Sequence, residues 1–193
     1  MKIVAFVGFL LVFNLAGCAN QGTKNVAASA GSSAESSSAT TANVVGSGTG
    51  TLLIKEIVFG ADAVIPSAVK NECALLTKLS AEIKANAANQ YTTVLEGSTS
   101  VPADAEVLSI EIINLMGSGG GAWSGAKSVM INGTLSKQGK AVGGFKALRV
   151  SGGGFFGGYK GTCAILGRCV KTLGKDVAGW LQNPTPNATL GDM

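Results

Sequence analysis

The chain has no histidine, and its acidic and nucleophilic side chains form no pattern that supports catalysis. Of 193 residues none is histidine, which excludes Ser-His-Asp triads, histidine-bearing zinc sites and histidine proton shuttles. Asp62, Asp104 and Glu111 have no catalytic partner at a useful spacing. We therefore expect no enzyme activity, no catalytic residue, no metal site and no cofactor.

The cysteine at position 18 follows a short apolar segment near the N-terminus. Lys2 carries a positive charge, residues 3–13 are an apolar run of eleven, and Leu15-Ala16-Gly17 precede Cys18. Eleven residues are too few to span a bilayer, which takes about 20. They fit the hydrophobic region of a secretory signal peptide.

This arrangement resembles the lipobox of bacterial lipoproteins. The resemblance implies cleavage between Gly17 and Cys18, diacylglycerol on the Cys18 sulfur and an acyl chain such as palmitate on its amine. Two or three acyl chains make a permanent anchor. Because Ala19 rather than an aspartate follows, the resemblance also implies sorting to the outer membrane of a diderm bacterium.

Composition divides the chain after the signal peptide (residues 1–17) into a tether, one domain and a tail. Of the fourteen residues 29–42, thirteen are Ala, Gly, Ser or Thr. Such a segment cannot bury enough surface to offset its ordering entropy. We therefore predict a disordered tether over residues 18–50, one domain over 51–183, and a flexible tail over 184–193.

Hydrophobic periodicity predicts an α+β domain with the order β-α-β-β-β-β-α. Strands are expected at residues 52–59, 91–95, 106–115, 128–135 and 140–150, the last two joined as a hairpin. One helix is expected after Pro66, with a stripe of Val69, Cys73, Leu76, Ser80, Ile83 and Ala87. A last helix carries Cys163, Leu166, Val170, Leu173, Val177 and Leu181. We expect a mainly antiparallel sheet with both helices on one face.

Residues 121–128, with the sequence GAWSGAKS, precede a hairpin, a glycine-rich segment at 151–161 and a terminal amphipathic helix. This succession resembles a family of uncharacterised Gram-negative lipoproteins with a domain of unknown function. The layout is also similar to the N-terminal domain of the Tol-Pal translocation protein, the curli secretion lipoprotein and the lipoprotein activator of penicillin-binding proteins. These families share no catalytic residue, so the resemblance implies a fold and assigns no site.

Two glycine-rich segments carry aromatic residues. These residues are Trp123, Phe155, Phe156 and Tyr159. Loops that present aromatic side chains make suitable docking surfaces; the alternative is that the rings fold back on the ends of the sheet.

Residues 152–157 match the pattern G-x-G-x-x-G of dinucleotide sites. A dinucleotide site needs a parallel βαβ unit. Only residues 184–193 follow the last helix, and we expect no second parallel strand there. We therefore predict no nucleotide site.

Charge is unevenly distributed along the domain. Residues 51–111 hold 4 Lys against 8 Asp and Glu, whereas residues 121–180 hold 9 Lys and Arg against one Asp. The basic half suits an acidic partner, an acidic lipid or a phosphorylated glycolipid, and the alternative is a solvated face. Its basic residues lack the aromatic interleaving typical of nucleic-acid binding, so we expect no nucleic-acid partner.

Three cysteines remain after lipidation, which in an oxidising periplasm favours one disulfide and one free thiol. In a continuous helix Cys163 and Cys169 are too far apart to bond, because Cα atoms beyond about 7 Å do not bridge. A Cys163–Cys169 disulfide therefore requires the last helix to begin near Gly167. Otherwise Cys73 pairs with Cys163. We favour Cys163–Cys169 and keep Cys73–Cys163 as the alternative.

Together these features predict an outer-membrane-anchored lipoprotein whose domain is a non-catalytic binding or adaptor module. The expected partners are the outer membrane, an envelope protein, and an acidic lipid or glycolipid. The sequence leaves open which side of the membrane the domain faces; we expect the periplasm. The alternative is a carrier or sensor of a small amphiphile, because small residues at strand positions would leave a cavity. These are Gly133, Ala141, Gly143, Gly144 and Ala147.

Overall fold

A computed structural model of the chain describes residues 44–45, 48–97, 100, 102–117, 126–152 and 161–193. The strands within these ranges are β1 (Val44–Val45), β2 (Thr51–Ile54), β3 (Val58–Phe59), β4 (Thr93–Glu96), β5 (Glu106–Met116), β6 (Lys127–Lys137), β7 (Lys140–Ser151) and β8 (Ala188–Gly191). The helices are α1 (Ser67–Glu72), α2 (Leu75–Ala87) and α3 (Thr162–Leu181).

One mixed sheet joins all the described strands. Its order is β1-β4-β2-β5-β6-β7-β8, and β3 pairs separately with β5. The long ladders β5–β6 and β6–β7 are antiparallel, whereas β2 runs parallel to β4 and β5, and β8 runs parallel to β7. The predicted hairpin is confirmed: Gln138 and Gly139 form its turn with φ of 51° and 75°, as a two-residue hairpin turn requires.

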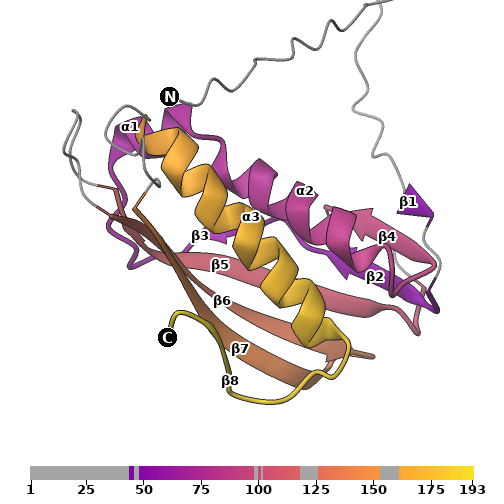
Figure 1. Cartoon of the computed structure of the whole chain (residues 1–193). Helices are drawn as coiled ribbons and strands as arrows, with labels where there is room; N and C mark the ends of the chain where they lie inside the picture. Colours follow the sequence, from indigo (N-terminus) through magenta and orange to yellow (C-terminus); the bar gives the residue numbers. More distant parts are fainter. Residues whose placement is uncertain (1–43, 46–47, 98–99, 101, 118–125, 153–160) are drawn as a thin grey trace, which may run out of the picture. The chain divides into compact units, whose positions relative to one another are not determined.

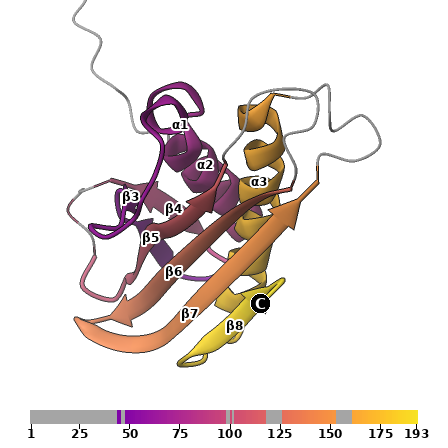
Figure 2. The same ribbon diagram turned by 90° about the vertical axis from the view of Figure 1, so that its left-hand side faces the viewer.

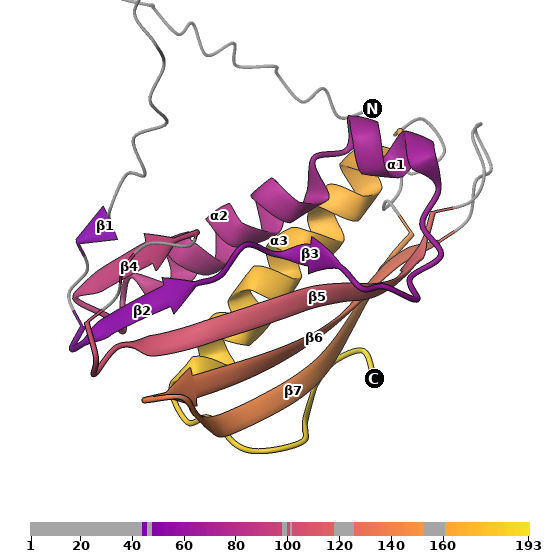
Figure 3. The same cartoon turned by 180° about the vertical axis from the view of Figure 1, so that it is seen from behind.

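The helices α2 and α3 lie side by side on one face of the sheet (Figures 1 and 3). Along β6 the buried residues alternate with more exposed ones, so one strand face meets the helices and the other does not. The core between the two layers includes Leu52, Leu79, Ile83, Leu108, Ile112, Val129, Ile131, Leu166, Leu173 and Val177. The predicted α+β class with helices on one face is therefore confirmed.

The predicted single helix after Pro66 is wrong, because it is broken into α1 and α2. Ala74 adopts the left-handed conformation with φ of 48°, which no α-helix contains. Lys78 Nζ donates a hydrogen bond to the Cys73 carbonyl at 2.8 Å and so satisfies an oxygen at the break. After the break, Leu75 and Leu79 are buried in place of the predicted Leu76 and Ser80, whereas Ile83 and Ala87 are buried as predicted.

The C-terminal tail is not flexible, which corrects the prediction for residues 184–193. β8 pairs with β7, and the Asp192 N–H donates to the Leu148 carbonyl at 2.8 Å. Arg149 holds two carboxylates: Nη1 lies 2.7 Å from Asp192, while Nε and Nη2 lie 2.7 and 2.8 Å from Asp176 on α3. The tail is thus fixed to both layers of the domain.

The predicted tether also ends earlier than expected. β1 pairs antiparallel with β4 within residues 18–50, where we predicted disorder. Gly48 lies so close to Gln90 that a Cβ there would sit 1.8 Å from the Gln90 carbonyl carbon. The sheet therefore begins at Val44, and the tether proper, residues 18–43, lies outside the described residues.

The disulfide joins Cys73 to Cys163, so the favoured Cys163–Cys169 pairing is wrong and the alternative pairing is present. α3 begins at Thr162 rather than near Gly167, which places Cys163 and Cys169 in the same helix, six residues apart. The Cα atoms of Cys73 and Cys163 are 4.9 Å apart. The bond ties the end of α1 to the start of α3.

Gly174 brings the two long helices into close contact. A Cβ at this position would lie 2.6 Å from the Glu82 Cβ and 2.9 Å from the Glu82 carbonyl carbon, both on α2. Backbone atoms cannot move aside as a side-chain tip can, so only glycine fits here.

We expect Gly174→Ala to destabilise the domain by about 1–3 kcal/mol, because the added methyl group overpacks the contact between helices. Urea denaturation monitored by circular dichroism measures the change. Gly179→Ala is the matched control: it is also in α3, but nothing lies within 4 Å of its Cβ position. The control should gain up to about 1 kcal/mol from helix propensity. Equal effects of the two substitutions would contradict the packing argument.

The disulfide should be visible by mass mapping of the mature protein. We expect proteolysis without reductant to yield one linked peptide pair containing Cys73 and Cys163, with Cys169 alkylated only after unfolding. Because the bond closes a loop of 90 residues, Cys73→Ala should lower the free energy of unfolding by about 2–5 kcal/mol. Cys169→Ala serves as the control, and a linked Cys163–Cys169 peptide would overturn the assignment.

Candidate functional site

Several predicted site residues lie outside the described residues. These are Gly17 and Cys18, at the predicted cleavage and lipidation point, and the aromatic residues Trp123, Phe155, Phe156 and Tyr159. The lipid anchor and the docking role of these aromatic residues therefore stay predictions. The strands that lead into the two glycine-rich segments, β5 and β7, are described as far as Met116 and Ser151.

The outer face of the sheet, opposite the helices, carries four apolar side chains at one end. Cross-strand pairing places Met116, Ser128 and Val150 in one row and Asn114, Met130 and Leu148 in the next. Met116 is 61% and Val150 48% exposed, and Met130 and Leu148 are partly exposed. We call Met116, Met130, Leu148 and Val150 the apolar strip.

Within the described part of the chain, no helix covers this face (Figure 2). The two rows that carry the strip contain no charged residue; the first charged row beyond them is Glu111, Asn132 and Lys146. Uncharged apolar surface gathered on one face is what binding surfaces present. The strip is therefore a candidate contact surface, and it lies at the strand ends from which the two aromatic segments continue.

A hollow of about 370 Å³ lies where the parallel strands β2 and β4 end against α2. It is lined by Lys55, Glu56, Ile57, Leu76, Thr77, Ser80, Glu96 and Gly97. In its wall Glu96 accepts hydrogen bonds from the Ser80 hydroxyl and from Lys84 Nζ, the latter at 2.7 Å. The volume suits a small molecule, but both carboxylate oxygens are already engaged by the protein.

The charge state of Glu96 follows from these contacts. Burial alone would raise its pKa, but hydrogen bonds from Lys84 and Ser80 outweigh burial, and the pKa lies below its ordinary value of 4.5. Glu96 is thus a carboxylate at neutral pH and joins β4 to α2. Its contribution to stability is present above pH 4.5 and is lost as the pH falls through the lowered value.

Among the described residues, Cys169 is the one cysteine outside the disulfide, and its thiol is buried and protonated. Burial, and after it the negative charge of Asp192, raises the pKa of Cys169 to about 11. Its Sγ donates to the main-chain oxygen of Lys127, a residue whose side chain is itself fully buried at the start of β6. A protonated, inaccessible thiol is unreactive, which makes Cys169 a packing residue.

Aromatic rings fill the space beside two of the strand glycines that were expected to leave a cavity. A Cβ on Gly133 would lie 2.4 Å from the Phe145 ring, and one on Gly143 would lie 2.8 Å from the Trp180 ring. These two rings pack edge to face with centroids 4.8 Å apart. The space expected for an amphiphile between helices and sheet is occupied there, so the carrier alternative loses its main support.

A second parallel strand does follow the last helix, so the prediction that none lies in residues 184–193 is wrong. α3 leads into β8, which runs parallel to β7, so β7, α3 and β8 do form a βαβ unit. Residues 153–160 of the glycine-rich pattern lie outside the described residues. The carboxylate at the end of β8, Asp192, binds Arg149 and the Val150 N–H.

The single carboxylates noted in the sequence occupy separate places. Asp62 and Asp104 are exposed in loops, and Glu111 is exposed on the outer face of β5. In the described part of the chain, no three His, Cys, Asp or Glu side chains gather as metal ligands would. Nor does any described helix have the length and apolarity to cross a membrane.

A substitution tests the role of Glu96. We expect Glu96→Gln to lower the free energy of unfolding at pH 7 by about 1–3 kcal/mol, because it removes the negative charge that faces buried Lys84. The difference from the unsubstituted protein should shrink as the pH falls below 4.5, as measured by urea denaturation across that range. Glu56→Gln, in the same hollow but exposed, should change little. A deficit that stays constant with pH would contradict the charged interaction.

Comparison with known proteins finds likeness in structure alone. No known family and no curated protein sequence matches the chain. Similar solved structures include the dodecamer of PelC from Paraburkholderia phytofirmans (11% identity, TM-score 0.42, covering 70% of this chain and 96% of that one). A Xanthomonas campestris protein of family DUF330 matches with 10% identity and a TM-score of 0.43, covering 71% and 86%. A minor lipoprotein from Acinetobacter baumannii matches with 16% identity and a TM-score of 0.36, covering 67% and 91%. At such values no residue role, ligand or assembly is transferred to this chain.

Proposed function

We propose that the protein is an outer-membrane-anchored periplasmic lipoprotein whose α+β domain is a non-catalytic binding module for an envelope protein. The apolar strip on the outer face of the sheet carries this proposal. Its four side chains are apolar and at least partly exposed, and they lie on three strands joined by antiparallel ladders. The Asp192 carboxylate borders the strip at the Val150 N–H. The partner that the strip suits is a protein surface that is itself apolar.

The anchor and tether give such a module its function. Acylated Cys18 would hold the protein at the membrane, and the tether predicted for the residues before Val44 would have an r.m.s. reach of roughly 30 Å. A partner in the same membrane is then met at a high effective concentration, so a modest contact area suffices for stable binding. The aromatic residues Trp123, Phe155, Phe156 and Tyr159 belong to this contact, since their segments continue from the strands that bear the strip.

The disulfide agrees with this location. Disulfides persist in the periplasm and are rare in the cytosol, and the Cys73–Cys163 bond joins two helices of the domain. The lipobox and the disulfide therefore point independently to export.

Photo-cross-linking in cells tests the proposal. A photoreactive amino acid at Val150 should give one dominant adduct with an envelope protein, and the same residue at exposed Ala85 on α2 should not. Adding Met116→Lys should abolish the Val150 adduct, because a charge in the apolar contact is costly to desolvate. Thr134→Lys, on the same sheet face but outside the strip, should leave the adduct intact.

Two results would refute the docking role. One is the absence of any specific adduct from Val150 in the lipidated protein. The other is an adduct that survives Met116→Lys as well as it survives Thr134→Lys, which would show contact without dependence on the strip.

A further inference from the structure

The solvent-facing side of α3 carries only positive charge. Arg168, Lys171 and Lys175 are exposed, at spacings of three and four that place them on one side of the helix. The one carboxylate of α3, Asp176, turns to the sheet and binds Arg149. The remaining exposed positions of α3 are the small residues Ala164 and Gly179.

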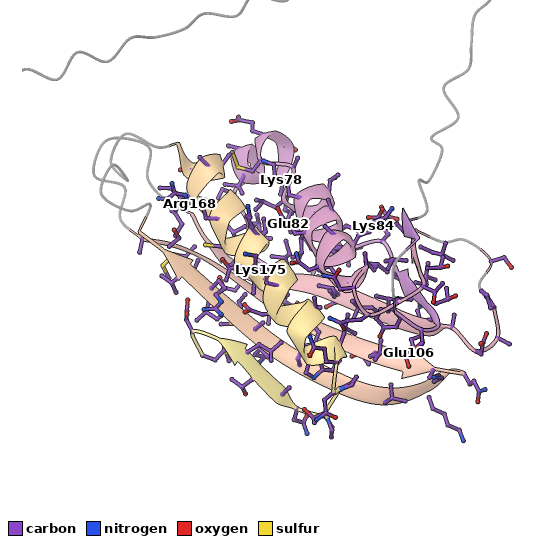
Figure 4. The ribbon with its side chains drawn as sticks, turned by 45° about the vertical axis from the view of Figure 1, so that its right-hand side comes forward. Lys78, Glu82, Lys84, Glu106, Arg168 and Lys175 are labelled. Carbon is purple, nitrogen blue, oxygen red and sulfur yellow. A yellow bond between two sulfur atoms is a disulfide. The ribbon has the colours of Figure 1, made fainter. Side chains whose placement is uncertain are left out.

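The adjacent side of α2 continues this surface. Lys78 is exposed, and the exposed positions beyond it are Ala81 and Ala85. Glu82 is the one carboxylate of α2, and it is half-buried beside Gly174. Figure 4 shows Lys78 and Glu82 on α2 and Arg168 and Lys175 on α3. We call Lys78, Arg168, Lys171 and Lys175 the basic helix face.

Lys78 also hydrogen-bonds the Cys73 carbonyl, but the stability of the fold does not account for Lys171 and Lys175. Lys and Arg stabilise a helix in its last turn, and α3 has none there. Like charges three and four residues apart lower helix stability. Among the described residues, Lys171 and Lys175 have no carboxylate within ion-pair distance. An external anion would account for Lys171 and Lys175, which repel each other and pair with no described carboxylate.

We propose that the basic helix face rests on the anionic headgroups of the membrane in which the protein is anchored. This inference rests on the lipid anchor of the proposed function. The anchor makes headgroup phosphates the anions at the highest local concentration, and each Lys or Arg near an anionic surface is attracted to it. The exposed positions that flank the charges are small residues, which leave room for the face to approach a flat surface.

Membrane contact of the helices would orient the domain. The basic helix face and the apolar strip lie on opposite faces of one sheet, since the strip alternates along β6 and β7 with the residues that face the helices. Headgroups against α3 therefore leave the apolar strip turned away from the membrane and open to a partner.

Vesicle sedimentation tests the inference with the mature chain carrying Cys18→Ser, so that no acyl chain contributes. We expect it to sediment with vesicles of phosphatidylglycerol and phosphatidylethanolamine, to stay in solution with phosphatidylcholine vesicles, and to dissociate as salt rises. Lys171→Gln with Lys175→Gln should weaken binding by roughly 30-fold. Lys140→Gln with Lys146→Gln is the control of equal charge, made on exposed lysines of β7, and should weaken it far less.

The outcomes separate this inference from the proposed function. Equal binding to both vesicle types, or equal loss in the two double variants, overturns the membrane contact. So does a Lys171/Lys175 variant that binds vesicles normally but loses its cross-linked envelope protein, which would assign the face to an acidic protein instead. Melting temperatures by circular dichroism should match in both variants, because all four lysines are exposed. The adduct from Val150 tests the binding module whichever vesicle result is obtained.

Discussion

The position of α3, beside α2 and against the sheet, is the constraint on which the rest of the structure depends. Three contacts hold the helix at different positions along its length. The disulfide from Cys73 to Cys163 fixes its start. The absence of a side chain at Gly174 lets its middle contact the backbone of α2, and Asp176 nearer its end forms a salt bridge with Arg149. A helix held at three points cannot rotate about its axis. Its apolar stripe therefore stays on the core, and its basic residues must face outward.

Fixing α3 also gives the two faces of the sheet different properties. Side chains alternate across a strand, so each inward residue of β6 and β7 has an outward neighbour. The inward set packs against α3, and the ring of Trp180 fills the space that Gly143 leaves. The outward set receives no such cover from the described elements, which is why four apolar residues at one end of it stay accessible. An apolar surface on one side and a basic one on the other are thus consequences of one packing arrangement.

Local pattern was enough to predict most elements of the fold and little of how they join. Strand alternation and helical stripes predicted β5, β6, β7, α3 and the placement of helices on one face. They could do so because the buried positions of a strand or helix recur with the period of that element. The break at Ala74 was missed, since a continuous stripe from Val69 to Ala87 fits one helix as well as two. β8 was missed because its alternating segment, ATLG, is only four residues long, and so short a run does not identify a strand. Its stability comes from Arg149 and from pairing with β7, contacts about 40 residues apart that spacing cannot reveal.

The candidate site shows the same limit. The predicted disulfide pairing depended on where α3 begins. Gly161 and Gly167 favoured a late start of this helix, but the helix begins at Thr162. The apolar strip combines residues from β5, β6 and β7 that only the strand register brings together. The sequence does show that Met116 and Val150 are apolar residues at outward positions of their strands. It does not show that the two residues lie in the same row of the sheet.

The uneven charge of the sequence takes on a more specific meaning in the fold. The basic half was expected to act as a whole, through both hairpin and last helix. In the structure, however, Lys137 pairs with Glu106 and Arg149 with Asp176 and Asp192. These pairs neutralise part of the hairpin with carboxylates from the acidic half, from α3 and from the tail. The exposed basic residues of α3 lie together on one surface. In the proposed membrane contact, the attraction to headgroups therefore comes from the helix more than from the hairpin. This contact makes the outer face of the sheet point away from the membrane.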